Sequence, residues 1–440
     1  MSDLDLARAA EQALDYAKQK GMQQAEVSLH QGTGVSITAR KQTLETIEKH
    51  NDAQIVLSVY KDHKTGSASS ADLTERGLKA TVDAAVSIAS YTGADDCFGL
   101  ADADRMATDL SDLDLYHNWG VSETDLVDMT LVCEQAALDG GEKISNSEGA
   151  SVNTYSGSAV YANSHGFMNT QKGSQHSISC SVIGEQDGAM QRDYWYDSNR
   201  NPANLATPES IGEHAAQRTL ARLGARQIKS QTATVMFDPS MAKSLVSHLI
   251  AGLKGGAIYK KASFLIDRLG QSVFPEFVTI SEHPHLLGES GSARFDGEGV
   301  ATPNSRNIIQ DGQLQSWVLG SYTARKLGLE STANSGGVRN IRISDTGHSF
   351  ENCLQTMHTG LLVTELIGSG INMVTGDYSR GAAGFWVEGG VIQYPVEEIT
   401  IAGNLLDMFM NVVAIAQDTD TRGNTHSGSI VVENMTIAGL

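Results

Sequence analysis

The stretch GFWVEGGVIQYPV, Gly384–Val396, decides the fold class. Two runs rich in β-branched and aromatic residues flank Gly389-Gly390, a pattern typical of a β-hairpin with a two-residue turn. Asp311-Gly312 separates RNIIQ from QLQSWVL in the same way, and Asp187-Gly188 marks a third candidate hairpin. Asp-Gly suits a type I′ turn because both central residues of that turn take positive φ angles. The hairpins predict an antiparallel sheet, curved or barrel-like, in the C-terminal part of the chain.

The region before this sheet mixes helices with strands. Helical periodicity and cap signals predict helices over residues 2–20, 72–91, 123–138 and 207–224. The acidic stretch Asp95–Asp114 lacks the ligand spacing of a calcium loop, so we interpret it as a solvated loop. The predicted fold class is α+β, in three domains: an α/β domain over 1–118, a helix-plus-hairpin domain over 119–230, and a mainly antiparallel β domain over 231–440.

Composition narrows the possible partners. The 440 residues carry 32 Lys and Arg against 52 Asp and Glu, a net charge of −20, which disfavours binding to nucleic acid or to anionic membranes. The N-terminal sequence is acidic and does not resemble a signal peptide, and no apolar run approaches the roughly 18 residues of a membrane span. The four cysteines are widely spaced, which is typical of a reduced, cytoplasmic protein.

The segment LVSHLIAGLKGG, Leu245–Gly256, has the features of one half of a metal site. Its apolar residues recur with helical period, and His248 lies at the edge of the apolar stripe. A zinc-binding helix usually offers two histidines and a glutamate, as in H-E-x-x-H. Here Leu249 follows His248 and Gly252 stands four residues on, so no second ligand is present.

Two other polar clusters are candidate sites. Glu282, His283 and His285 form one, and an H-x-H pair can suit a metal, but Pro284 between the histidines favours a locally hydrogen-bonded turn. The second cluster is Asp377, Tyr378 and Arg380, within the glycine-flanked segment Gly376–Gly381. It fits either an exposed loop that contacts substrate or a structural turn with Arg380 paired to Asp377.

Three long blocks of the C-terminal part resemble the PmbA/TldE family, one of the two related chains of the TldD/TldE protease system. The blocks are VSHLIAGLKGGAIYKKASFL, TISEHPHLLGESGSARFDGEGVATP and VTELIGSGINMVTGDYSRGAAGFWVEGGVIQYPVEEITIAGNL. The resemblance extends, more loosely, through the first 230 residues. It implies a bacterial metalloprotease complex that acts on unfolded peptides, and a chain of the TldE type.

The resemblance also provides an interpretation of the helix that carries His248. The matching helix of TldD-type chains carries H-E-x-x-x-H, with a cysteine near the C-terminus as a further ligand. Two placements of this chain on the motif are possible. If His248 takes the first histidine position, Leu249 replaces the Glu and Leu253 replaces the second His; if the frame shifts by one, Ser247, His248 and Gly252 occupy these three positions. In both placements a base or a ligand is missing, and no cysteine follows Cys353. The helix is therefore interpreted as a relic of a metal site, with no cofactor in this chain.

The implied partners follow from the same resemblance. Zinc or iron is expected in a TldD-type partner chain, and this chain, when alone, is expected to form a homodimer, because a surface that binds a related chain can pair with itself. Two alternatives stay open. One is a stand-alone metallopeptidase that uses Glu282, His283 and His285, and the other is a scaffold that binds peptides without a cleaving partner.

Overall fold

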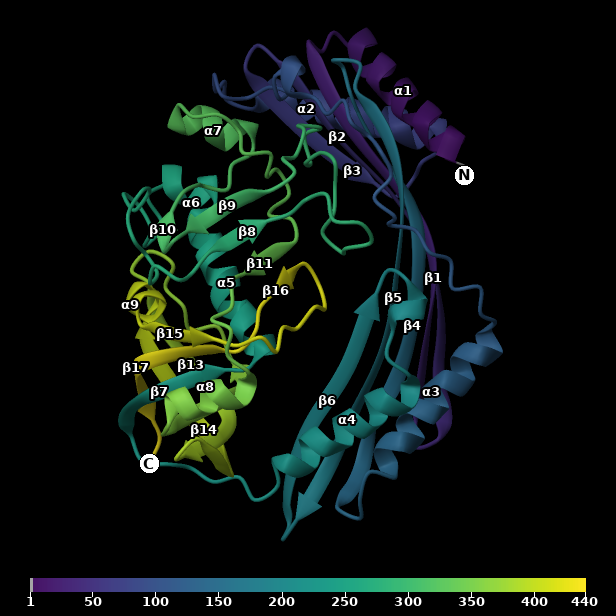
Figure 1. Cartoon of the computed structure of the whole chain (residues 1–440). Helices are drawn as coiled ribbons and strands as arrows, with labels where there is room; N and C mark the ends of the chain where they lie inside the picture. The colour runs from purple at the N-terminus through teal and green to yellow at the C-terminus, as the bar shows by residue number, and fades with distance from the viewer. Residues whose placement is uncertain (1–2) are drawn as a thin grey trace.

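The computed structural model describes residues 3–440 and divides into a long curved sheet with four helices and a separate C-terminal body (Figure 1). Residue 2, the predicted start of the first helix, lies outside the described residues. The elements of the first part are α1 (Asp3–Gln19), β1 (Gln24–Arg40), β2 (Thr43–Lys61), β3 (Lys64–Ser70), α2 (Glu75–Tyr91), η1 (Ala103–Arg105), α3 (Glu123–Leu138), β4 (Ile144–Asn163), β5 (Met168–Gln186), β6 (Ala189–Asn199), η2 (Pro202–Asn204) and α4 (Pro208–Ala221).

A single antiparallel sheet, ordered β3-β2-β1-β4-β5-β6, carries two hydrophobic cores. Near one end, α1 and α2 pack on residues such as Leu29 of β1 and Val160 of β4. Towards the other end, α3 and α4 pack on Ile37 of β1 and Val152 of β4. The same two strands therefore run through both cores, and β1 pairs with β4 across the predicted boundary at residues 118–119. That boundary remains a prediction based on the sequence.

The C-terminal body contains the helix that carries His248 and the strands and helices that surround it. They are β7 (Gln231–Phe237), α5 (Pro239–Leu253), α6 (Gly255–Tyr259), β8 (Ile280–Glu282), β9 (Arg306–Gln310), β10 (Gln313–Leu314), α7 (Ser321–Leu327), β11 (Ile341–Ile343), α8 (Phe350–Met357), β12 (Gly360–Ile367), β13 (Asp377–Glu388), β14 (Val391–Asn404), α9 (Leu405–Met410), β15 (Val412–Ile415), β16 (Thr425–His426) and β17 (Ile430–Ala438).

Five strands of this body close into a barrel, in the order β14-β13-β12-β7-β17, and the ring is completed by the pairing of β17 with β14. The closing contact joins two copies of one short sequence, since Thr400–Ala402 of the first TIAG segment pairs with Thr436–Ala438 of the second. A second sheet, β10-β9-β8-β11-β16, lies beside the barrel. The pairings β7–β12 and β11–β16 are parallel, and the other ladders of these two sheets are antiparallel.

The three predicted hairpins are confirmed. Gln186 pairs with Ala189, Gln310 with Gln313, and Glu388 with Val391, each across a two-residue turn. Both turn residues have positive φ in every case, at Asp187-Gly188, Asp311-Gly312 and Gly389-Gly390. The predicted α+β fold class, with a barrel-like, mainly antiparallel C-terminal domain, is likewise confirmed.

The interpretation of the acidic stretch Asp95–Asp114 as a solvated loop is wrong in part. Its carboxylates form ion pairs with basic residues of the C-terminal body: Asp95 with Lys326 at 2.5 Å, Asp102 with Arg325 at 2.9 Å and Asp109 with Arg294 at 3.0 Å. Through these ion pairs the stretch connects the curved-sheet part of the molecule to the C-terminal body. No helix among residues 3–440 combines the length and apolar character that crossing a membrane would require.

Candidate functional site

His248 lies on α5, which begins directly after barrel strand β7. The carboxylate of Asp238 caps the helix by accepting a hydrogen bond from the backbone N–H of Met241 at 2.8 Å, and Pro239 occupies the first helical position. One face of α5 packs into the main hydrophobic cluster, with Leu245, Leu249 and Leu253 at most 3% exposed. His248 lies at the border of that face and is half-buried.

The residues around His248 do not fit a metal ion. Leu249 and Leu253 are completely buried among apolar side chains, so neither position is open to a ligand. A Cβ atom at Gly252 would lie 3.0 Å from side-chain atoms of both Leu265 and Phe264, so any larger side chain there requires these two residues to shift. Within residues 3–440, no three His, Cys, Asp or Glu side chains come together as a metal site requires.

The segment Gly376–Gly381 is neither the loop nor the turn that the sequence left open, because strand β13 begins at Asp377. Successive strand residues point to opposite faces of a sheet. Asp377 is exposed and accepts a hydrogen bond from the Thr375 hydroxyl at 2.6 Å, whereas Tyr378 is 1% exposed. The Asp377–Arg380 pair of the structural-turn alternative does not form in the structure; the Arg380 guanidinium instead donates to the carbonyl of Leu366 at 3.3 Å.

The fold brings together two candidate sites that lie far apart in the sequence. The ring of His248 on α5 lies edge-on to the ring of Tyr378 on β13, with 6.1 Å between centroids. Three polar atoms at this contact are buried without a hydrogen-bond partner: His248 Nε2, the Tyr378 hydroxyl and Arg380 Nε. Such groups are uncommon in folded proteins and require an explanation.

The electrostatics of this cluster keep its histidine and tyrosine neutral. Burial, together with the nearby positive charge of Arg380, lowers the pKa of His248. Burial raises the pKa of Tyr378 to about 12, and Arg380 partly offsets that effect. The cluster therefore presents one fixed positive charge, a neutral imidazole and a neutral phenol. It can form hydrogen bonds to a bound molecule, but it contains no carboxylate that could act as a general base.

The predicted cluster of Glu282, His283 and His285 does not converge on one point. Glu282 is 1% exposed and accepts hydrogen bonds from Arg306 and from Asn334. The ring of His283 contacts the hydroxyl of Ser281 at 2.8 Å. His285 contacts Asn304 and Thr302 at 2.8 and 2.9 Å. Each side chain is thus hydrogen-bonded within the fold, and Glu282 lies in strand β8 with partners distant in sequence rather than in a locally bonded turn.

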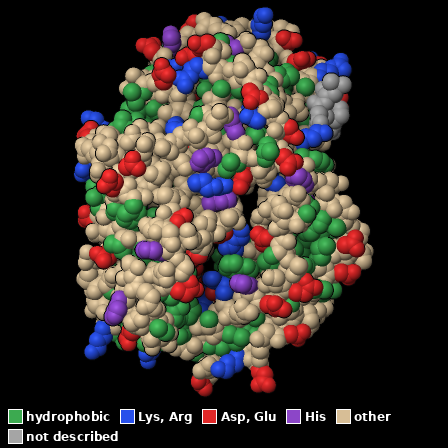
Figure 2. Space-filling model, viewed as in Figure 1, with side chains coloured by type: hydrophobic (Ala, Val, Ile, Leu, Met, Phe, Trp, Pro, Cys, Tyr) green, Lys and Arg blue, Asp and Glu red, His purple; other side chains and the backbone are tan. Residues whose placement is uncertain are grey.

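The molecule is hollowed between the curved sheet and the C-terminal body, and Lys, Arg and His side chains gather along the hollow (Figure 2). Cavities of about 440, 310 and 370 Å³ follow one another along β5, β6 and the facing loops of the C-terminal body. The first two share Arg200 and Ser290, and the last two share Thr421. Sequence analysis missed these cavities because their walls come from segments far apart in the chain.

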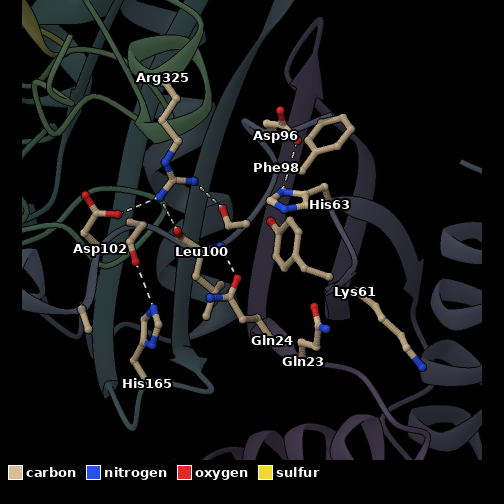
Figure 3. A pocket seen from close by; sticks show the side chains of 14 residues that line it. Gln23, Gln24, Lys61, His63, Asp96, Phe98, Leu100, Asp102, His165 and Arg325 are labelled. Atoms are coloured by element: carbon tan, nitrogen blue, oxygen red, sulfur yellow. Dashed lines mark hydrogen bonds and ion pairs between the residues drawn. The ribbon is translucent and has the colours of Figure 1, made fainter. Parts of the chain in front are cut away.

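A further cavity, of about 580 Å³, lies where the ends of β1 and β2 meet the acidic loop (Figure 3). Arg325 of α7 points into this loop and donates hydrogen bonds to the carbonyls of Gly99 and Leu100. Gln24 accepts a hydrogen bond from the Leu100 N–H, and His165 contacts the Ala101 carbonyl. The polar groups of the cavity wall therefore bind one another, so we interpret this cavity as a junction between the curved sheet and the C-terminal body.

Comparison with known proteins matches the chain along most of its length. Residues 230–439, 116–223 and 25–89 match the models of the PmbA/TldA metallopeptidase C-terminal domain, central domain and domain 1. The Metalloprotease PmbA of Escherichia coli O157:H7 is 46% identical over 434 residues, which cover 99% of this chain and 96% of that protein.

Solved structures share the fold. A candidate modulator of DNA gyrase from Bacteroides thetaiotaomicron superposes with a TM-score of 0.93 at 29% identity, over 98% of each chain. TldE from Thermococcus kodakarensis superposes with a TM-score of 0.81 at 20% identity, over 98% of this chain and 100% of that chain. With three family models and a full-length relative matched in order, the chain belongs to the PmbA/TldD family of metalloproteases.

Proposed function

We propose that this chain is the TldE-type, non-catalytic subunit of a cytoplasmic metalloprotease complex that cleaves unfolded peptides. One observation carries the proposal: the positions that would complete a metal site around His248 are the buried Leu249 and Leu253 and the crowded Gly252. A metallopeptidase needs a bound metal to activate water. The TldD-type partner would therefore hold the zinc or iron, and Ser247, His248 and Gly252 would be the remnant of a corresponding site.

The second part of the proposal concerns the peptide. We assign its contact with this chain to the β13 residues Asp377, Tyr378 and Arg380 and to the hollow beside β6. Support comes from the unpartnered donors at Tyr378 and Arg380 and from the connected cavities. Because Tyr378 is almost completely buried, it would act by supporting Arg380.

The decisive experiment is to purify this chain with and without a TldD-type relative and to assay cleavage of an unfolded peptide. The expected result is cleavage by the mixture alone, which a chelator abolishes, and elemental analysis that finds no stoichiometric zinc or iron on this chain. About one tightly held metal ion per chain, lost in His248→Ala, would contradict the proposal.

The same experiment separates the two alternatives. A stand-alone peptidase built on Glu282, His283 and His285 would cleave without the partner, and His285→Ala would abolish that activity. A scaffold without a cleaving partner would bind peptide but would form no complex with the relative. Because all three side chains are already hydrogen-bonded within the protein, the cluster is poorly suited to bind a metal ion or to supply a nucleophile.

A further inference from the structure

Two glycines line the cavity of about 440 Å³ and leave part of its wall without side chains. Gly157 of β4 and Gly173 of β5 stand directly opposite each other in the ladder, so they face the same side of the sheet. A Cβ atom at Gly157 would lie 3.2 Å from Nε2 of His30, and one at Gly173 would lie 3.1 Å from Nη1 of Arg200. The absence of side chains at these positions lets polar groups approach the backbone closely.

Two guanidinium groups enter this cavity without a carboxylate partner. Arg200 bridges the cavity, because it donates to the carbonyl of Ser174 on β5 at 3.2 Å and to the carbonyl of Ser290 on the C-terminal body at 2.7 Å. The Arg339 side chain makes no hydrogen bond or ion pair with residues 3–440. Burial lowers the pKa of both arginines, and at Arg339 the nearby carboxylates of Asp296 and Glu282 partly offset this effect. Arg200 Nε, Arg339 Nε and the Ser290 hydroxyl are all buried without a hydrogen-bond partner.

The acids near Arg339 are committed to other groups. Asp296 lines the same cavity, but its two carboxylate oxygens accept hydrogen bonds from the backbone N–H groups of Glu298, Val300 and Ser335 at 2.9 to 3.1 Å. Glu282 is engaged by Arg306 and Asn334. A buried charge without a paired counter-charge is costly, in a chain that otherwise has an excess of acids. The cavity is therefore complementary to an anion.

The geometry of the groups favours a carboxylate as that anion. Arginine presents a planar fork of donors that matches the two oxygens of a carboxylate. The His30 and Tyr155 rings stack at 6.1 Å beside the arginines and provide a flat wall for a neighbouring side chain. A cavity of this size accommodates a few residues of an extended chain rather than a folded partner.

We propose that Arg200 and Arg339 bind a carboxylate of a peptide in the cavity between the curved sheet and the C-terminal body. The carboxylate belongs either to the C-terminus of the peptide or to an Asp or Glu side chain. The inference deepens the proposed function by naming the chemistry that this chain recognises. It concerns binding by this chain alone, so it can fail while the complex with the partner still forms and cleaves.

The test is fluorescence anisotropy of the purified chain with labelled short peptides in four forms: C-terminal acid or amide, each with an internal Glu or Gln. The expected result is that neutralising the recognised carboxylate weakens binding about tenfold to a hundredfold, as expected for the loss of charge-assisted hydrogen bonds. A penalty at the C-terminus or at the internal position identifies which carboxylate is bound. Equal affinity for all four forms, or no binding, overturns the proposal.

Variants localise the site. Arg339→Ala should weaken binding of the acidic peptide to the level of its neutral form, and its melting temperature should stay close to that of the parent, because the packing lost with this side chain is offset by the removal of a buried charge that has no ion pair. Arg192→Ala is the matched control, since Arg192 lies on β6 outside the cavity and pairs with Glu148. Unchanged binding by Arg339→Ala would overturn the assignment. Inorganic phosphate serves as competitor, and displacement of every peptide form alike by phosphate would show a general anion site instead.

Discussion

The imidazole of His248 and the phenol ring of Tyr378 meet edge-on, 6.1 Å apart, although 130 positions separate them along the chain (378 minus 248). This contact joins the helix that resembles a metal-binding helix to the strand with candidate peptide contacts. It places both candidates in one cluster in which His248 Nε2, the Tyr378 hydroxyl and Arg380 Nε have no hydrogen-bond partner.

Substitution at this cluster should affect peptide binding more than the chemical step. We expect Arg380→Ala to raise the KM of the reconstituted complex severalfold with little change in kcat, because the partner performs the chemistry. Ser379→Ala, an exposed position on the opposite face of β13, is the control and should leave KM unchanged. A lower melting temperature with an unchanged KM would instead assign Arg380 a purely structural role.

The hydroxyl of Tyr378 allows a sharper comparison. Because it is buried without a hydrogen-bond partner, Tyr378→Phe should leave the free energy of unfolding unchanged or raise it by up to about 1 kcal/mol. Tyr378→Ala should lower it by about 3–5 kcal/mol through the cavity left in the core. Urea unfolding curves measure both effects. A clear loss of stability in Tyr378→Phe would mean that the hydroxyl is bonded in solution, for example to Arg380.

Restoring a histidine at position 252 should not restore a metal site. We expect Gly252→His to lower stability by about 1–3 kcal/mol, because the new side chain must displace Leu265 and Phe264. Gly256→His is the matched control, since a Cβ atom there meets nothing within 4 Å. Thermal unfolding and elemental analysis check the two parts. Stable folding with stoichiometric zinc in Gly252→His would show that the helix surroundings still fit a metal.

The ion pairs of Asp420 with Lys243 and Arg422, at 2.7 and 2.9 Å, predict a specific loss of stability in acid. Burial alone would raise its pKa, but hydrogen bonds from Arg422 and Lys243 outweigh burial and hold the pKa at about 2. A carboxyl whose pKa is depressed in the folded state stabilises the protein above its unfolded pKa, near 4, and this contribution disappears as the pH falls from about 4 to about 2.

Asp420→Asn should therefore lower the melting temperature at pH 7, and the difference from the parent should shrink below pH 4. Asp128→Asn, an exposed site on α3, should show no difference at either pH. Arg422 also packs on the rings of Trp195 and Tyr196, at 4.2 and 4.3 Å from their centroids. A difference between Asp420→Asn and the parent that is independent of pH would refute the ion-pair explanation.

The assembly of the chain alone is open to direct measurement. We expect a homodimer at tens of micromolar, seen in sedimentation velocity as about twice the chain mass of 46.9 kDa. Addition of the TldD-type relative should convert the homodimer into a mixed complex. A monomer at all concentrations would contradict the first expectation and leave the second to be tested separately.

Local features of the fold were predictable from the sequence, and long-range ones were not. The hairpin at Gly389-Gly390 depends on two residues with positive φ, so its signal lies within a few positions. The glycines around Tyr378 led to the prediction of a loop or turn, but strands of this barrel also use glycine where two backbones come close together. A Cβ atom at Gly384, in the same strand, would lie 1.8 Å from the carbonyl oxygen of Leu362, so glycine marks close strand contact there rather than a loop.

The candidate site was predictable only in pieces. The sequence identified His248 and Arg380 through their residue types and neighbours, but their proximity depends on how α5 packs against the barrel. The cavity between Arg200 and Arg339 has no local signal in the sequence, since its lining residues are spread along the chain from His30 to Arg339. The ion pairs of Asp95–Asp114 were missed for the same reason, because their partners lie beyond residue 290.

Closure of the barrel by the second TIAG segment has a consequence for synthesis on the ribosome. Strand β17 (Ile430–Ala438) fills the gap between β7 and β14, yet it is translated after both of them, and long after β7 (Gln231–Phe237). Until residues 430–438 leave the exit tunnel, the nascent C-terminal domain is an open sheet with unpaired edges, and such edges readily pair with other chains. Chaperone protection during translation should therefore matter most for this domain, whereas the hairpins of the curved sheet can form as soon as they emerge.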